Sequence, residues 1–346
     1  MTTVSDWDDF TLKIDNVVAV VPCLKLVLYL DSTDDASILE FYQRSMEALG
    51  GLITHYQAEN MKTRGRLNER ALTIVPTWLK RPRANKDYHI GFSGCSIGQG
   101  VSAAMIRLDL FRRPPRNFTP EREAKERAAR KVLYEEMGCE YTRPATALRI
   151  TFPLDHKLAD PAKLLDWVMG LSLVREWPFL SGHCGYNLNY FEEAGSVSIH
   201  ESMQSWLGSL CLRYPGFDWN NAGGVLTHLL RYDSTSSDLI PMIKRVNWLT
   251  LVSHKAVDYL GGVRRLLDGL DQDLPIISHP VSGGFVIQAG PAPQTGDVGA
   301  RDFIPIYRRV AGVLRPIRLE TIPGLGVGFS DDAAMEWLEA FDKDID

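Results

Sequence analysis

The sequence has few cysteines, no long apolar run and little net charge, and each absence excludes a class of protein. Five cysteines in 346 residues, none in CxxC spacing, argue against a disulfide framework or a zinc ribbon and suit a reducing cytoplasm. No apolar run reaches the roughly 18 residues of a membrane span, and the acidic N-terminus does not resemble a signal peptide. A net charge of −5 argues against general affinity for nucleic acid. We therefore expect a soluble, cytoplasmic protein.

Strand-like and helix-like segments are interleaved along the chain. The β-branched, apolar run Val17–Leu30 predicts a buried strand. Further strand-like runs follow at Ala71–Leu79, Tyr88–Ser93 and Val101–Phe111, without crossover helices between them. This pattern predicts an α+β (or α/β) fold: a mixed, largely antiparallel sheet with helices packed on it. Whether it consists of two related halves stays open. Residues 1–140 and 141–346 are the expected subdomains, with one continuous domain as the alternative.

The stretch 213–262 is rich in aromatic side chains and turn signals. Pro215-Gly216 predicts a type II turn, in which proline presets φ and glycine accepts a positive φ. An apolar strand follows at Val246–Val252, and Ser253 is expected to cap a short helix that Gly261-Gly262 ends. The stretch has no spacing typical of a metal site, a nucleophile or a phosphate cradle, so it predicts packing, recognition or both.

Gly94-Cys95-Ser96-Ile97-Gly98 matches the G-x-S-x-G motif of serine hydrolases. The motif requires a strand before the serine and a helix after it. The residues after it instead alternate as in a strand, which favours a glycine-rich hairpin. A serine hydrolase of the α/β type using Ser96, with a later acid and a histidine such as His279, remains the alternative function.

Three further motifs resemble functional sites. His200-Glu201 begins a zinc-binding pattern, but Gln204 stands where the second histidine would be. Gly324–Gly328 spaces its glycines unlike a dinucleotide loop and precedes an acidic helix that would repel pyrophosphate. A loop with Arg64, Arg66 and Arg70 is a candidate phosphate-binding or scaffold surface. No metal or cofactor is predicted.

The C-terminal segment is acidic and is expected to form a helix from Asp331. Its acids suit a helix N-terminus, and Met335, Leu338 and Phe341 predict a buried stripe with Trp337 at its edge. The outer carboxylates form either a solvated face or a contact surface for a basic partner.

Several segments together resemble a bacterial family of type VI secretion immunity proteins, the TsiV/TsiT-like group. The resemblance is best over about residues 145–342. It rests on the following segments: Gly185–Phe191, Arg213–Asp218, Val246–Thr250, Leu260–Gly262, Tyr307–Arg309, Leu314–Arg318 and Trp337–Phe341.

The resemblance implies a non-enzymatic inhibitor that binds and neutralises a cognate effector, with a restriction-endonuclease-like nuclease as the expected toxin. It brings no catalytic residues, and a homodimer is left open. Carboxylates placed where phosphates would lie suit an inhibitor of a DNA-binding cleft. The candidate partner-binding residues are Trp219, Asp331, Asp332, Glu336 and Glu339.

Overall fold

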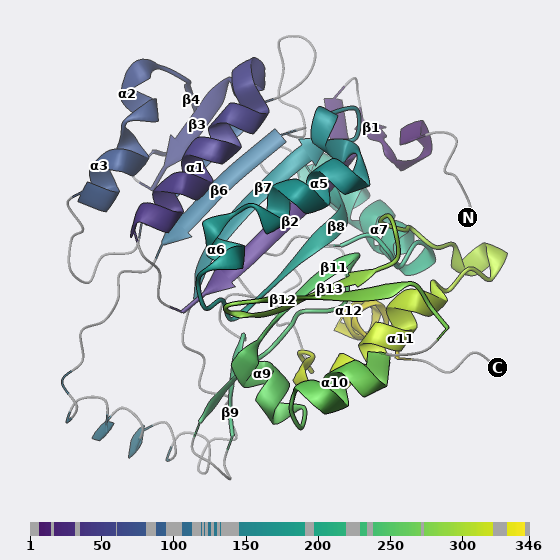
Figure 1. Cartoon of the computed structure of the whole chain (residues 1–346). Helices are drawn as coiled ribbons and strands as arrows, with labels where there is room; N and C mark the ends of the chain where they lie inside the picture. The colour runs from purple at the N-terminus through teal and green to yellow at the C-terminus, as the bar shows by residue number, and fades with distance from the viewer. Residues whose placement is uncertain are drawn as a thin grey trace.

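An eleven-stranded sheet forms the centre of the molecule (Figure 1). The computed structural model describes residues 7–14, 17–31, 35–59, 61–80, 88–94, 106–112, 119, 121, 124–125, 128–129, 132, 145–190, 197–218, 229–233, 238–270, 273–320 and 331–342. Its strands run in the order β12-β13-β11-β8-β2-β7-β6-β5-β3-β4, with β1 paired to β2. Every strand pair in this sheet is antiparallel. The predicted fold class is confirmed.

The strands of this sheet have the following bounds: β1 Leu12–Ile14, β2 Val17–Leu30, β3 His55–Ala58, β4 Gly65–Arg66, β5 Tyr88–Gly94, β6 Ile106–Arg112, β7 Thr146–Pro153, β8 Ser181–Tyr190, β11 Leu249–Ser253, β12 Ile276–Val281 and β13 Gly284–Ala289. A separate two-stranded sheet pairs β9 (Leu230–Tyr232) with β10 (Leu239–Pro241). The large sheet is continuous across residue 140, because β7 lies between β2 and β6. The division into two subdomains stays a prediction.

Helices cover the sheet on both faces. They have the following bounds: α1 Asp35–Leu49, α2 Glu69–Leu72, α3 Ile74–Lys80, α5 Pro161–Met169, α6 Ser172–Arg175, α7 Val197–Arg213, α9 His254–Tyr259, α10 Val263–Leu270, α11 Pro305–Leu314 and α12 Asp331–Leu338. The described residues also form five short 3-10 helices: η1 Trp7–Phe10, η2 Gly50–Leu52, η3 Lys157–Ala159, η4 Val298–Ala300 and η5 Arg315–Ile317.

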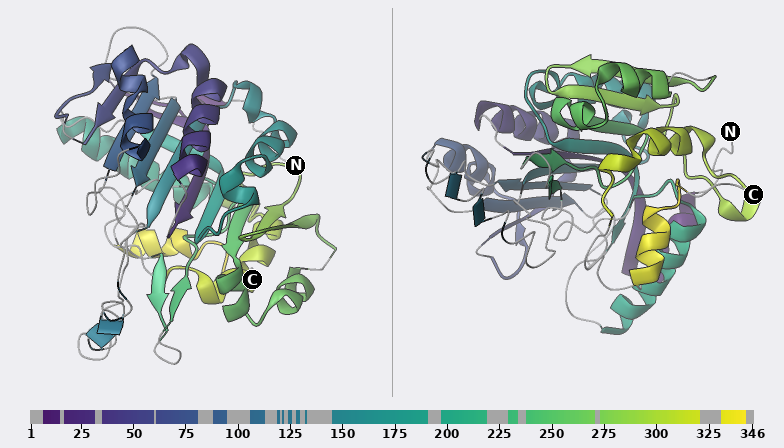
Figure 2. Two further views of the ribbon diagram at one scale, coloured as in Figure 1. Left: turned by 60° about the vertical axis from the view of Figure 1, so that its left-hand side comes forward. Right: turned by 90° about the horizontal axis from the view of Figure 1, so that it is seen from below.

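The two faces of the sheet differ in chemistry, and β2 shows the difference. Neighbouring residues of a strand point to opposite faces. On the face of Leu24, the ring of Phe152 packs against Trp167 of α5, and α1, α5 and α6 cover the strands (Figure 1). On the face of Lys25, α7 packs on β2 and α12 packs on α7 (Figure 2). The first face is apolar, whereas the second buries a set of charged side chains.

The prediction of a strand at Ala71–Leu79 is wrong, because this segment forms α2 and α3. Ala71, Val75 and Leu79 are the buried residues, and their spacing of four is helical. Asn68 caps α2 by accepting a hydrogen bond from the Ala71 N–H at 2.9 Å. The β-branched residues between them favoured a strand. The packing of α3 against α1 instead stabilises the helical conformation, which places the buried residues on one side.

Candidate functional site

A group of charged side chains lies buried behind the centre of the sheet, and we call it the Asp218 hub. Asp218 follows α7 and forms ion pairs with Lys25 of β2 and with Lys244, which precedes β11. His183 of β8 lies beside them, with its Nε2 2.8 Å from the carboxylate. These four side chains are exposed by 3% or less. Three segments that are distant in the sequence therefore contact the carboxylate of Asp218.

Burial and charge pairing act in opposite directions on the groups of the hub. Desolvation lowers the pKa of Lys244 to about 7 and that of His183 to about 4, despite the attraction of Asp218. Burial would raise the pKa of Asp218, but the two lysines and His183 outweigh it and hold it well below its usual value. His183 is thus neutral at pH 7 and donates its Nε2–H to an ionised carboxylate.

The Arg213–Asp218 segment is also held through its backbone, by two side chains next to the hub. The guanidinium of Arg245 donates to the carbonyl of Pro215 at 2.9 Å, and Trp337 of α12 donates to that of Phe217 at 3.3 Å. Arg245 is buried between two rings, 4.2 Å from the centroid of Trp337 and 4.5 Å from that of Phe341.

The prediction of a type II turn at Pro215-Gly216 is wrong. Phe217 N–H does donate to the Tyr214 carbonyl at 3.1 Å, which closes a four-residue turn, but Gly216 does not have a positive φ. Glycine is required for space, since an added Cβ would lie 1.9 Å from the carbonyl oxygen of Gln294. The Gly216 N–H also donates to Thr295 at 2.7 Å. The turn is pressed against a neighbouring loop.

Other predictions for the 213–262 stretch are confirmed. Trp248 and Leu249 are fully buried, and the indole of Trp248 donates to the carbonyl of Gly290 at 2.9 Å. The Ser253 side chain caps α9, accepting from the Ala256 N–H. Gly261 and Gly262 end α9 with φ values of 99° and 92°, which L-residues rarely adopt.

A second polar cluster lies on the same face of the sheet, farther toward its β4 end. Burial alone would raise the pKa of Asp109 on β6, but the guanidinium groups of Arg107 and Arg149 lower it to about 2. Arg149 Nε donates to the carboxylate at 2.8 Å. This side of the sheet is therefore held by ion pairs, whereas the side under α1 is held by apolar contacts.

The hydrolase motif begins at the end of a hairpin strand. Ser96 lies outside the described residues, but the strands on either side of it, β5 and β6, pair with each other in antiparallel register. A nucleophile elbow leads from a strand into a helix instead. Gly94 is explained by packing, because a Cβ there would lie 1.9 Å from the Leu52 carbonyl oxygen. His279 lies on β12, with its Nε2 3.0 Å from Gln288.

The remaining motifs find structural settings. His200 and Gln204 belong to α7, but their side chains lie outside the described residues, as does the whole Gly324–Gly328 segment. No group of three His, Cys, Asp or Glu side chains suited to a metal ion occurs in the described part of the chain. Of the basic loop, Arg66 lies on the short strand β4 and Arg70 on α2. None of the helices described is long and apolar enough to cross a membrane.

Three of the candidate partner-binding residues, Asp331, Asp332 and Glu336, belong to α12, and Glu339 directly follows it. Asp332 and Glu336 are exposed one turn apart, while Glu339 lies 3.8 Å from Arg318. Asp331 begins the helix, but its side chain lies outside the described residues, as does Trp219. Trp337 is fully buried and not at the edge of the stripe as predicted, whereas Met335 is half-buried.

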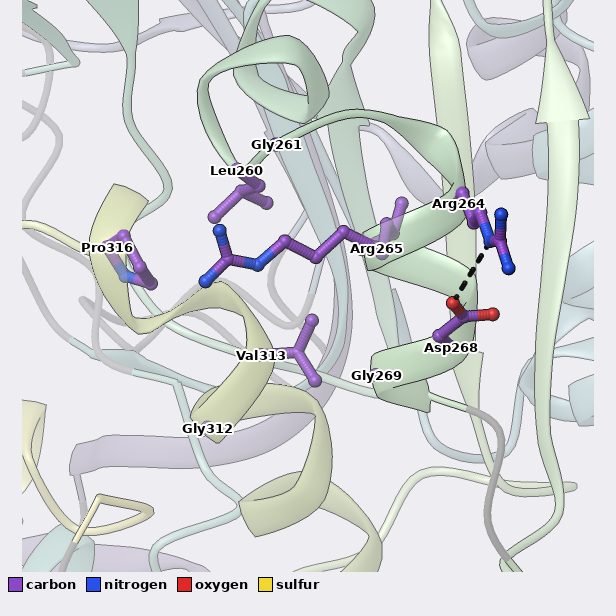
Figure 3. Close-up of a pocket in the computed structure, with 10 residues that line it drawn as sticks. Leu260, Gly261, Arg264, Arg265, Asp268, Gly269, Gly312, Val313 and Pro316 are labelled. Carbon is purple, nitrogen blue, oxygen red and sulfur yellow. Dashed lines mark ion pairs between the residues drawn. The ribbon is translucent and has the colours of Figure 1, made fainter.

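A pocket of about 560 Å³ opens between α10 and α11 (Figure 3). Leu260, Val313 and Pro316 form its apolar walls, and the side chain of Arg265 extends across it. At its rim, Arg264 and Asp268 form an ion pair at 3.6 Å. Among the described residues, Arg265 has no hydrogen bond or ion pair. Within the described part of the chain, the positive charge of Arg265 in the pocket has no counterion.

Sequence reasoning missed both the hub and this pocket. A signal for the hub was present: Lys25 is a charged residue within the apolar run Val17–Leu30, and a charge buried in a strand requires a counterion. For the pocket no signal existed, because α10 and α11 are separated by more than thirty residues of chain.

Comparison with known proteins identifies the family. Residues 119–341 match the model of TsiV, described as type VI immunity for VRR-NUC. This match spans more than half of the chain. The chain belongs to the TsiV family.

A solved structure shares the fold of this TsiV family member. The Pseudomonas aeruginosa T6SS protein PA0821 superposes with a TM-score of 0.69 at 18% identity, covering 94% of this chain and 83% of that chain. At this identity the likeness concerns the fold alone. No match is found among curated proteins. The predicted resemblance to type VI secretion immunity proteins is confirmed.

Proposed function

We propose that this TsiV family member protects the cell that makes it by binding a VRR-NUC nuclease effector delivered by type VI secretion. The observation that carries the proposal is the family match over residues 119–341, whose description names immunity to that nuclease class. The fold supports it, because a sheet with buried ion pairs on one face can present the same surface to a partner before and after binding.

Inhibition is by occupancy and requires no catalysis by this chain. A nuclease that binds DNA presents basic side chains to the phosphates, so a protein surface with carboxylates at matching positions can occupy the same cleft. Charge complementarity also raises the association rate by roughly 10- to 10³-fold, which matters when the inhibitor must reach the toxin before it reaches DNA.

The acidic face of α12 is our candidate for this contact. Asp332 and Glu336 lie one turn apart and are exposed; Asp331 is the first residue of the helix and Glu339 directly follows its last. The helix is held from behind, since Trp337 is buried against Arg245 and Phe217. Trp219, next to the hub residue Asp218, is our candidate aromatic anchor, because large aromatic side chains dominate interface energies.

The proposal is tested by protection and by binding. A VRR-NUC nuclease effector from the source bacterium is expressed in a bacterial host with and without the chain, and survival and genomic DNA integrity are measured. We expect protection and a stable complex in size-exclusion chromatography. A version exported from the cytoplasm should protect poorly, since the toxin acts on DNA inside the cell. Loss of viability despite folded, abundant protein would contradict the proposed function.

A further inference from the structure

The pocket between α10 and α11 has the chemistry of an anchor site for a carboxylate. Arg264 at the rim is paired with Asp268, and among the described residues that line the pocket this leaves Arg265 as the cation without an ion pair. The walls are apolar, from Leu260, Val313 and Pro316. A guanidinium among apolar walls forms two parallel hydrogen bonds with a carboxylate, and the walls contact its methylene groups.

Glycines give the pocket its depth and orient Arg265. An added Cβ on Gly261 would lie 2.7 Å from the Cδ of Arg265, so a larger residue there would displace that side chain from its position across the opening. A Cβ on Gly269 would meet Val313 at 3.1 Å, so the two helices approach closely at the base. Two segments on which the family resemblance rests, Leu260–Gly262 and Leu314–Arg318, meet at this site.

The helices that form the pocket also expose apolar surface. Eight large hydrophobic side chains are exposed among the described residues, and three of them, Tyr259, Val263 and Leu267, lie within nine residues on α9 and α10. Interfaces combine such surface with a few buried anchors, among which arginine is enriched. This clustering is independent of the pocket and indicates a protein partner.

We infer that this pocket binds an aspartate or glutamate side chain of the nuclease effector, with Arg265 as the residue that pairs with it. The inference rests on the proposed function and adds a second contact region to it, distinct from α12. A nucleic acid backbone fits less well, because phosphate binding uses arrays of cations. Among the described residues that line this pocket, Arg265 is the one cation without an ion pair. The carboxylate enters between Leu260 and Val313 and replaces the solvent that hydrates Arg265.

Neighbouring arginines allow a matched test. Arg265→Gln and Arg264→Gln remove the same charge one residue apart. Both side chains are exposed in the free chain, but Arg265 extends across the pocket whereas Arg264 pairs with Asp268 at its rim. Affinity for a catalytically inactive form of the same VRR-NUC nuclease effector is measured by calorimetry. We expect Arg265→Gln to raise Kd by roughly 30-fold or more, as for one partner of a desolvated charge pair. Arg264→Gln should change Kd by less than about 3-fold, as for a rim charge.

A second variant fills the pocket without removing any charge. An added Cβ on Gly312 of α11 meets nothing within 4 Å, so Gly312→Met is expected to fold normally and to occupy the space of the ligand. It should raise Kd by about 10-fold or more, while Gly312→Ala leaves it nearly unchanged. Circular dichroism and the unfolding midpoint establish that both variants are folded.

The outcomes separate this inference from the proposed function. If the wild-type chain fails to bind the nuclease, the proposed function fails. If the wild type binds and Arg265→Gln binds as tightly, the carboxylate anchor is wrong while the function stands. If Arg265→Gln instead weakens binding to a DNA duplex and leaves nuclease binding unchanged, the pocket serves phosphate and the inference is overturned. In a charge-reversal test, Arg265→Glu weakens binding and replacing one acid of the nuclease by arginine restores it. The acid whose replacement restores binding is the side chain bound in the pocket.

Discussion

The guanidinium carbon of Arg245 lies 4.2 Å from the ring centroid of Trp337. Arg245 precedes a central strand of the sheet, and Trp337 belongs to the last described helix, so this contact fixes α12 against the core. The Trp337 indole donates to the carbonyl of Phe217, one residue before the carboxylate of the hub. The packing behind α12 therefore determines that Asp332 and Glu336 face outward.

The first prediction concerns the counterion of the hub. Replacing Asp218 by Asn should lower the free energy of unfolding by roughly 3–5 kcal/mol, because Lys25 and Lys244 would remain buried without their carboxylate. Lys244→Met should cost much less, since Asp218 keeps Lys25 and His183 and methionine fills the volume. Urea unfolding followed by tryptophan fluorescence measures both. Equal losses in the two variants would contradict the hub as described.

The second prediction concerns stability in mild acid. Burial lowers the pKa of His183 to about 4 in the folded chain, against about 6.5 for a solvent-exposed histidine. Between these values the unfolded chain binds a proton that the folded chain does not. The contribution of His183 is therefore fully present above pH 6.5 and is lost as the pH falls toward 4. The free energy of unfolding should decline less over this range in His183→Gln than in wild type; parallel pH curves would disprove the assignment.

The third prediction compares two glycines. Gly216→Ala should destabilise the chain strongly or prevent folding, because its Cβ would lie 1.9 Å from the Gln294 oxygen. Gly312→Ala, within helix α11 and with open space around it, should stabilise it by about 0.5–1 kcal/mol through better helix propensity. Thermal unfolding of the two variants and the wild type makes the comparison. A mild effect at Gly216 would show that the loop at Gln294 moves easily.

The fourth prediction concerns the acidic face of α12. Reversing charge in the double variant Asp332→Lys/Glu336→Lys should slow association with the nuclease by roughly tenfold or more and flatten its dependence on salt. The control makes the same charge change at Glu47 and Asp155, exposed acids elsewhere on the chain. Stopped-flow association at two ionic strengths measures the rates. Equal effects of the two double variants would remove α12 from the interface.

Local patterns predicted much of the secondary structure. The apolar run Val17–Leu30 is strand β2, and Ser253 caps α9 before the paired glycines that end it. These features depend on neighbouring residues, so the sequence can reveal them. The helices α2 and α3 escaped prediction, because a short segment with helical spacing and β-branched residues fits both conformations until its neighbours are placed.

The Asp218 hub depends on register and not on local pattern. Lys25 and His183 share a face because β2 and β8 pair with Val27 opposite His183, and Asp218 reaches both from a turn after α7. A shift of one residue in that pairing would point His183 to the apolar face. Local pattern therefore shows that Lys25 needs a partner without naming it.

The sequence by itself determined the class of fold, the capped helices and, through its family resemblance, membership in a group of type VI immunity proteins. These follow from periodicity, turn chemistry and recurring segments, all of which are properties of short stretches. The tertiary structure alone decided why Gly216 is glycine, which residues neutralise Asp218 and that Arg265 crosses a pocket. Each of these depends on segments far apart in the chain. The distances between those segments are fixed only when the strands pair in register and the helices pack on the sheet.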